Sequence, residues 1–384
     1  MLQFCVSQQN NDIPFTFRAT GIRVFSFEEA MYHIYHYWRE SVDDFLSNEM
    51  ITWVSELGLS FIANRMREIA HSHRGFAAQL LQFFKLSEYF DKGEIAALST
   101  ALQEWEARLE WEKLKERADY LVNRGEPGQA LPLYKRALKA EDHSFLHNNI
   151  AVAYLQLQSY KEALYHFSVA YKLEQDNMAV LLHYIEAAIL AREFATAAEL
   201  LQKAEAAAPH DSDIPFLHGL MAHEKRQYMQ ALEHYNKARD LHETPHYTYK
   251  IVDVYMAMRQ YEKALAAINK LASKDAQYYV KEADIHAGAG DYTAALRCIK
   301  EATANFEGAS NASLWTKLAK YHRQDYNWQK AEEAIQNALE LAPDNNKVRL
   351  EYARIKKGLG KTREYQAELG RILQNFKEVY RSSH

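Results

Sequence analysis

The sequence predicts an all-α chain in which a solenoid of repeated helix pairs follows an N-terminal helical domain with a short extended arm. Two observations favour this class: small residues recur with a period of about 34 positions, and residues 1–108 do not follow that period. The composition agrees, because 13 Gly and 7 Pro in 384 residues leave few helix breakers. With 48% hydrophobic residues, the chain can bury a large core and is not disordered.

Residues 1–108 are expected to hold an arm followed by helices. β-favouring residues lie on both sides of Ala19-Thr20-Gly21, which suggests a short hairpin or extended segment. Ser26 and Glu29 have capping-box spacing, which predicts a helix start. Further helices are predicted over 49–70, 74–90 and 92–123. The last of these runs without a break into the first repeat, so we place the domain boundary near residue 108 and expect a rigid attachment to residues 109–384.

Seven copies of a repeat align on an alanine in the second helix of each copy. These alanines are Ala130, Ala163, Ala197, Ala231, Ala264, Ala295 and Ala331. The intervals between them are 33, 34, 34, 33, 31 and 36 residues, and small residues recur twelve positions earlier and seven later. Each copy is predicted to be two antiparallel helices whose close crossing requires small side chains.

Turn signals and one irregular segment complete the array. Turns are expected at 123–127, 288–291 and 324–326, and Pro209 and Pro343 follow second helices that a proline cannot continue. A longer loop is expected at 308–311 and a shortened one near Ser273. The segment 346–379 keeps helical periodicity but is rich in Lys and Arg, so we interpret it as an eighth, capping pair.

One copy identifies the family that the repeats resemble. The seventh copy has the residue spacing of the tetratricopeptide repeat (TPR). The residues with this spacing are Trp315, Leu318 and Ala319 in its first helix, then Ala331, Ala338 and Pro343. His322 and Ile335 replace the usual Tyr and Phe. Residues of about 111–379 therefore resemble a TPR array, which implies a superhelical solenoid whose first helices line a concave groove.

Charge and cysteine content restrict the function. A net charge of −5 gives no electrostatic footprint for nucleic acid or anionic membranes, so we expect neither as a partner. Cys5 and Cys298 lie far apart in the sequence, which argues against a disulfide framework or a structural zinc site. The N-terminus lacks signal-peptide features and no apolar stretch could span a membrane, so we expect a cytoplasmic protein.

Motifs that carry chemistry are absent from the sequence. Phosphate-binding glycine loops, HExxH and GxSxG do not occur. The pairs His33/His36 and His71/His73 have ligand-like spacing but lack a third ligand nearby, and amphipathic histidines at helix interfaces explain them as well. We therefore expect no enzyme activity, no cofactor and no metal.

The resemblance implies which residues would bind a partner. With Ala118-type residues counted as the eighth position of each repeat, positions 2, 5, 6, 9, 12 and 13 should face the groove. The candidate groove residues are Asn149, His183, Phe216, Leu217, Leu220, Tyr249, Lys250, Lys317, Lys320, Arg323 and Arg354. We expect the four apolar ones to be anchors and the cations from Lys317 onward to contact acidic groups of the partner. The alternative is that these cations are only the solvated face of a capping pair.

One TPR subfamily clamps the acidic C-terminus of heat-shock chaperones with five residues. Lys115 and Asn149 match two of its positions, whereas Asp119, Ala179 and His183 differ in charge or size. That specific clamp is therefore not expected here.

Three functions remain. The leading hypothesis is a non-enzymatic scaffold or adaptor that binds a segment of another protein, in chaperone or assembly work. The second is a peptide-responsive regulator that resembles the pheromone receptors with TPR arrays, although those have longer repeats and this chain lacks a helix-turn-helix module. The third is an enzyme whose site lies in residues 1–108.

Overall fold

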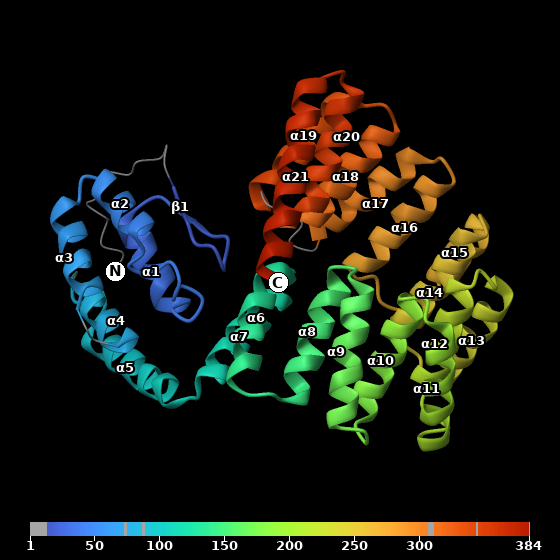
Figure 1. The fold of residues 1–384 in the computed structure, drawn as a ribbon. Coiled ribbons are helices and arrows are strands. Elements are labelled where there is room, and N and C mark those ends of the chain that lie inside the picture. The colour runs from blue at the N-terminus through green and yellow to red at the C-terminus, as the bar shows by residue number, and fades with distance from the viewer. Residues whose placement is uncertain (1–13, 73–74, 87–88, 306–310, 343–344, 384) are drawn as a thin grey trace. The chain divides into compact units, whose positions relative to one another are not determined.

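A computed structural model describes residues 14–72, 75–86, 89–305, 311–342 and 345–383. The chain divides into two compact parts, Met1–Asp142 and His143–His384, which are taken separately below. Over the described residues there are 21 helices and one two-stranded hairpin, which confirms the predicted all-α class with a short N-terminal arm (Figure 1).

The arm is an antiparallel hairpin. Strand β1 (Phe15–Thr16) pairs with β2 (Arg23–Val24), and the turn between them contains Gly21 at a φ of 67°, which glycine adopts without steric cost. Helix α1 (Phe27–His36) begins at Ser26, whose hydroxyl accepts from the Glu29 N–H at 3.2 Å. The Glu29 carboxylate returns to the N–H of Phe25 instead of Ser26, so the predicted capping box is formed with a shift of one residue.

Four more helices complete the N-terminal bundle. They are α2 (Asn48–Glu56), α3 (Ser60–Ala70), α4 (Phe76–Phe84) and α5 (Lys92–Ala107). The single helix predicted over 49–70 is wrong, because Gly58 takes a φ of 83° and separates α2 from α3. Aromatic side chains from the hairpin, α1, α2, α4 and α5 form one buried cluster, to which α3 adds apolar side chains that are not aromatic. In this cluster Phe83 packs edge-on against Phe27 and Phe45.

The predicted unbroken helix over 92–123 is also wrong. Arg108 and Leu109 have extended backbones, and α6 (Glu110–Asn123) starts anew with the Glu112 carboxylate accepting from the Leu109 N–H at 2.9 Å. Ion pairs of Arg39 with Glu116 and of Asp43 with Arg117 still tie α6 to the N-terminal bundle. A separate fold for residues 1–108 remains a prediction.

The repeats form eight helix pairs: seven follow the alanine spacing, and the eighth is the predicted capping pair. In the first compact part, α6 pairs with α7 (Pro127–Ala140). In the second, the pairs are α8 (Ser144–Gln156) with α9 (Tyr160–Leu173), α10 (Met178–Leu190) with α11 (Phe194–Ala207), α12 (Asp213–Glu224) with α13 (Tyr228–Leu241), and α14 (Pro245–Ala257) with α15 (Tyr261–Ile268). They continue as α16 (Ala276–Gly288) with α17 (Tyr292–Asn305), α18 (Ala312–Gln324) with α19 (Trp328–Leu341), and α20 (Asn346–Gly358) with α21 (Thr362–Ser383).

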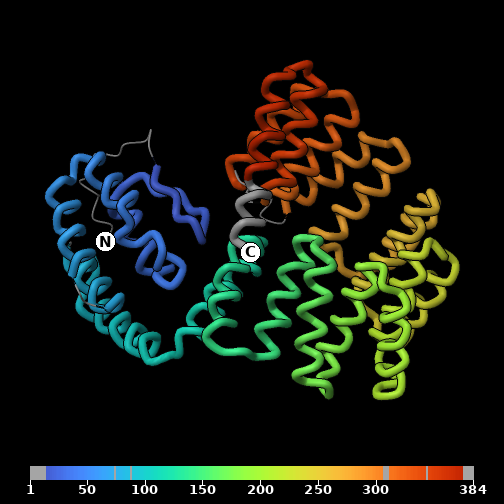
Figure 2. The backbone as a smooth tube through the Cα atoms, in the orientation of Figure 1, coloured from blue at the N-terminus to red at the C-terminus, as the bar shows by residue number. Residues whose placement is uncertain are grey.

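Small residues allow the helices of each pair to cross closely. The seven second-helix alanines are fully buried, as the sequence predicts. Gly219 on α12 shows the constraint most directly, because an added Cβ would lie 2.6 Å from the ring of Tyr235 on α13. Consecutive pairs also contact each other, so the backbone of α8–α21 runs back and forth between neighbouring helices (Figure 2).

The turn within a pair has a recurring geometry. Gly125, Gly290 and Tyr326, which lie in the three predicted turns, all have a positive φ. Gln158 and Arg192 adopt the same left-handed conformation without being glycine. In the turn at Gln158, the Ser159 N–H donates to the Tyr154 carbonyl at 2.9 Å, which is the Schellman arrangement that ends a helix.

Two irregularities concern α15 and the loops. Helix α15 has 8 residues, whereas the second helices of the other pairs have 14 or, in α21, 22. The 31-residue interval therefore reflects a short helix and not the shortened loop expected near Ser273. Pro209 follows α11 as predicted. Pro343 and nearly all of the loop expected at 308–311 lie outside the described residues.

Candidate partner-binding face

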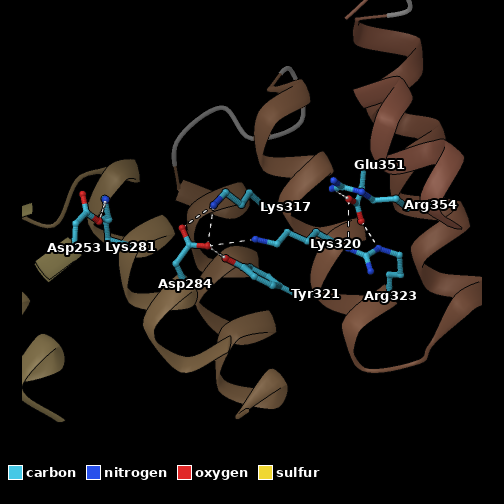
Figure 3. Close-up of polar contacts among 9 residues, drawn as sticks. All are labelled: Asp253, Lys281, Asp284, Lys317, Lys320, Tyr321, Arg323, Glu351 and Arg354. Carbon is cyan, nitrogen blue, oxygen red and sulfur yellow. Dashed lines mark hydrogen bonds and ion pairs between the residues drawn. The ribbon is translucent and has the colours of Figure 1, made fainter. Parts of the chain in front are cut away.

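The first helices of the later pairs carry charged side chains that contact one another from pair to pair (Figure 3). We call these side chains, together with one tyrosine, the charged row. Its members lie on α14, α16, α18 and α20. They are Asp253, Lys281, Asp284, Lys317, Lys320, Tyr321, Arg323, Glu351 and Arg354. The four cations predicted at the C-terminal end of the groove are all members of the row.

Asp284 on α16 is the centre of one half of the row. Lys317 on α18 donates through Nζ to both carboxylate oxygens of Asp284, at 2.8 and 2.6 Å. The Tyr321 hydroxyl donates to Oδ1 at 2.7 Å, whereas the Nζ of Lys320 lies 3.9 Å from the same oxygen. Because these three residues are on the next first helix, Asp284 links two successive pairs. Lys281 makes a similar link from α16 back to Asp253 on α14.

Glu351 on α20 is the centre of the other half. Its side chain is only 4% exposed, and a carboxylate with so little water contact needs partners of opposite charge. Arg323 on α18 donates through Nε to Oε1 at 2.5 Å, and Arg354 donates to Oε2 at 3.2 Å. Arg354 itself is 54% exposed, so its guanidinium has donors left for a partner.

The electrostatics of the row leave a local positive excess. The row has more cations than carboxylates. The cations are Lys281, Lys317, Lys320, Arg323 and Arg354, and the carboxylates are those of Asp253, Asp284 and Glu351. Burial lowers the pKa of Lys320, and the neighbouring Lys317 lowers it further. Burial and the Asp284 carboxylate raise the pKa of Tyr321, so its hydroxyl stays a donor. Lys320 is therefore the most weakly compensated cation of the row, and an added carboxylate would be favourable there.

The four predicted apolar anchors lie elsewhere. Phe216, Leu217 and Leu220 on α12 are buried in the apolar core between α10 and α14, where Phe216 packs against Tyr235 and Tyr247. Tyr249 on α14 is also buried, and its hydroxyl donates to Asp275 at 2.9 Å. Their position count is that of groove residues, but their side chains pack within the array. This placement gives them a structural role and leaves their expected binding role untested.

The remaining predicted residues are half-buried. Asn148 connects Asn149 to His183, because its amide donates to Asn149 at 3.3 Å and its Oδ1 lies 3.3 Å from His183 Nδ1. Lys250 places Nζ 6.0 Å from the ring centre of Phe216. In the first compact part, Lys115 forms an ion pair with Asp119 at 2.6 Å. Lys115 matches a position of the chaperone clamp, but Asp119, which does not match, neutralises its charge.

Sequence reasoning missed the ion pairs between the carboxylates and the cations of the charged row. Asp253 and Asp284 each directly follow the eighth position of their repeat, and Lys281 and Lys317 both occupy the sixth position of the next one. This register of Asp at position 9 and Lys at position 6 is readable in the sequence and would have predicted the two pairs. Glu351 has no such repeat signal, because its partners come from positions 12 and 9.

Comparison with known proteins identifies the repeats. A family model described as tetratricopeptide repeat matches residues 115–177 and 280–346, which include helices of both compact parts. These two stretches of the chain are tetratricopeptide repeats. Its eight helix pairs and their alanine crossings agree with the TPR pattern. A comparison with curated proteins finds no significant match.

Several solved structures are similar to this TPR protein. A TPR protein from Parabacteroides merdae is 18% identical, covers 65% of this chain and 99% of its own, and has a TM-score of 0.45. A thermophilic TPR protein from Thermus thermophilus is 20% identical, with 46% and 98% coverage and a TM-score of 0.40. MamA from Desulfovibrio magneticus is 20% identical, with 42% and 92% coverage and a TM-score of 0.34. At these identities the likeness concerns the fold alone.

Within the described ranges, every helix falls short of the length and apolar character that crossing a bilayer requires.

Proposed function

We propose that this TPR protein is a scaffold or adaptor that binds an acidic segment of another protein on the charged row. The TPR fold supports the general role of a protein–protein interaction scaffold. The acidic character of the segment and its position on α16–α20 are the specific parts of the proposal. Asn149, His183 and Lys250 remain candidate contacts for the same partner.

The positive excess of the charged row carries this proposal. Its carboxylates are already occupied by Lys317 and Arg323, which hold successive helix pairs together. Lys320 and Arg354 are held less closely, by one contact of 3.9 Å and one of 3.2 Å, and both side chains are exposed by more than a third. A carboxylate of a partner can therefore bind these two cations without disrupting the links between pairs.

The test removes the two available cations and leaves the structural ones in place. Lys320→Gln combined with Arg354→Gln neutralises the site, whereas reversal of Lys317 to Glu would set two acidic groups together at Asp284. Lys263→Gln is the matched control, since Lys263 is an exposed lysine on the second helix α15. The unmodified protein, the double variant and the control are used to capture partners from a lysate of the source organism, with quantitative mass spectrometry as the readout.

We expect at least one partner to be lost with the double variant and retained with the control. Its affinity for the double variant should fall about tenfold at low salt and differ little at high salt, because rim charges act mainly on association rate. Equal capture by all variants would contradict the charged row as the site. A fragment of residues 109–384, checked by circular dichroism, tells whether the N-terminal bundle contributes. Partners lost only with that fragment would assign recognition to residues 1–108.

A further inference from the structure

The sixth helix pair contains a cluster of three side chains of the types that bind metal ions. Glu282 and His286 lie four residues apart on α16, and therefore on one face of that helix. Cys298 lies on the facing helix α17. One potential ligand atom from each residue lies within 4.8 Å of the other two.

Two of the three residue types differ from those at the equivalent positions of the next pair. The equivalent positions of the seventh pair, each 36 residues later, hold Leu318, His322 and Ala334, and all three are buried in the core. The sixth pair thus places a carboxylate and a thiol where its neighbour has two apolar side chains. Polar groups in such half-buried positions require a compensating interaction.

The present contacts compensate the cluster only in part. The Cys298 thiol donates to Glu282 Oε2 at 3.4 Å. The Tyr278 hydroxyl lies 3.3 Å from the other oxygen, but it has a closer acceptor in Asn269 at 2.7 Å. Cys298 is 4% exposed, whereas Glu282 and His286 are half-buried and reachable from solvent. An ion can therefore enter from the side of Glu282 and His286 and meet a shielded sulfur.

We propose that Glu282, His286 and Cys298 bind a Zn²⁺ ion that joins α16 to α17. A thiol, an imidazole and a carboxylate together are a typical donor set for zinc, and three protein ligands leave the fourth tetrahedral position to water. The three ligand atoms now lie within 4.8 Å of one another. Bonds of about 2.0–2.3 Å to a shared ion require the distances between these atoms to shorten by about 1 Å. On binding, the thiol releases its proton to solvent and Zn–S, Zn–N and Zn–O bonds form without any redox change.

Cobalt titration of the full-length protein tests this site directly. After removal of metals by a chelator, Co²⁺ is added and the absorbance is followed. We expect one equivalent of Co²⁺ to produce a thiolate-to-cobalt charge-transfer band in the near ultraviolet together with the visible bands of a tetrahedral site, and Zn²⁺ to abolish both. Absence of the charge-transfer band in the unmodified protein would overturn the proposal.

Matched variants assign the ligands. Cys298→Ser should remove the charge-transfer band, and Glu282→Gln or His286→Asn should weaken cobalt binding about tenfold or more. Cys5→Ser and His322→Asn are the controls, since they remove the other cysteine and the equivalent histidine of the seventh pair. A band that survives in Cys298→Ser but disappears in Cys5→Ser would overturn the assignment.

A second readout does not depend on the metal's colour. Zn²⁺ should slow hydrogen exchange in α16 and α17 of the unmodified protein and leave α18 and α19 unchanged. The same protection in Cys298→Ser, or no protection in the unmodified protein, would contradict a site at this place.

Discussion

The N-terminal bundle and the TPR pairs bury their apolar residues in different ways. In the bundle, one cluster extends from Phe15 to Trp105, and its ring contacts join residues far apart in sequence, such as Trp38 with Trp105. In the second compact part, the helices contact mainly their immediate neighbours, and the buried residues fall into several clusters. A bundle of the first kind should unfold as one unit, whereas an array of the second kind should respond to a change mainly in adjacent pairs.

The largest expected effect tests the bundle. Phe83→Ala should destabilise it by about 3–5 kcal/mol, because Phe83 is fully buried in the aromatic cluster. Hydrogen exchange should then accelerate throughout α1–α5 and stay unchanged in α8–α21. Acceleration confined to α4 would show that the bundle is not cooperative.

A smaller effect is expected from the charged row. Arg323→Met should destabilise α18–α21 by about 2–4 kcal/mol, because it leaves the buried Glu351 with a single, partly exposed partner. Chemical denaturation and regional hydrogen exchange measure the change. Adding Glu351→Met should recover most of the loss, since no buried charge then remains. If the double variant is as unstable as the single one, packing and not charge explains the effect.

The bundle should also respond to acid through His33. Burial, with contributions from Arg124 and His36, lowers the pKa of His33 to about 4. The unfolded chain has a histidine pKa of about 6.5, so it binds the proton first as the pH falls. The bundle should therefore keep this contribution above pH 6.5 and lose about 1.4 kcal/mol per pH unit between 6.5 and 4.

The measurement for His33 is the pH dependence of exchange protection in α1–α5. His33→Gln should flatten that dependence, because glutamine does not titrate. An unchanged slope in this variant would assign the acid sensitivity to other groups.

The smallest effect tests the close crossings of the array. Ala331→Leu should destabilise the seventh pair by about 1–3 kcal/mol, because Ala331 is fully buried where α18 and α19 cross. Ala266→Leu is the control: Ala266 is exposed on α15, so the change should stay within about 0.5 kcal/mol. Equal thermal shifts for the two variants would show that the register is wrong.

The repeats were predictable because their period constrains several positions at once. Seven of the helix pairs and the buried alanines follow from that spacing, whereas local turn signals predicted the turns at Gly125 and Gly290. The break in the helix at Arg108–Leu109 could not be predicted, because no Gly or Pro marks it. The Glu112 carboxylate caps the new helix by accepting from the Leu109 N–H. Local composition there favours helix on both sides.

The site was predictable only in part. Counting positions identified Lys317, Lys320, Arg323 and Arg354 as one group, and the structure places them in the charged row. The same count could not tell that Phe216 and Tyr249 are buried, since exposure at a groove position depends on the distance to the next first helix. The cluster at Cys298 escaped for a related reason, because helix pairing brings Glu282 and His286 to it.

The short helix α15 has a consequence for how the array responds to force. It ends at Ile268, so the second helix of the fifth pair is shorter than those of the other pairs. Only a small apolar cluster, which includes Ile268 and Tyr278, lies between the large clusters on either side over the described residues. In a linear array, the weakest junction between neighbours is where cooperativity breaks. Pulled from its C-terminus, the array should therefore release α16–α21 as one block before α8–α14 open. The members of the charged row on α16, α18 and α20 would then leave together in a single mechanical step, and only the ion pair of Lys281 with Asp253 on α14 would break.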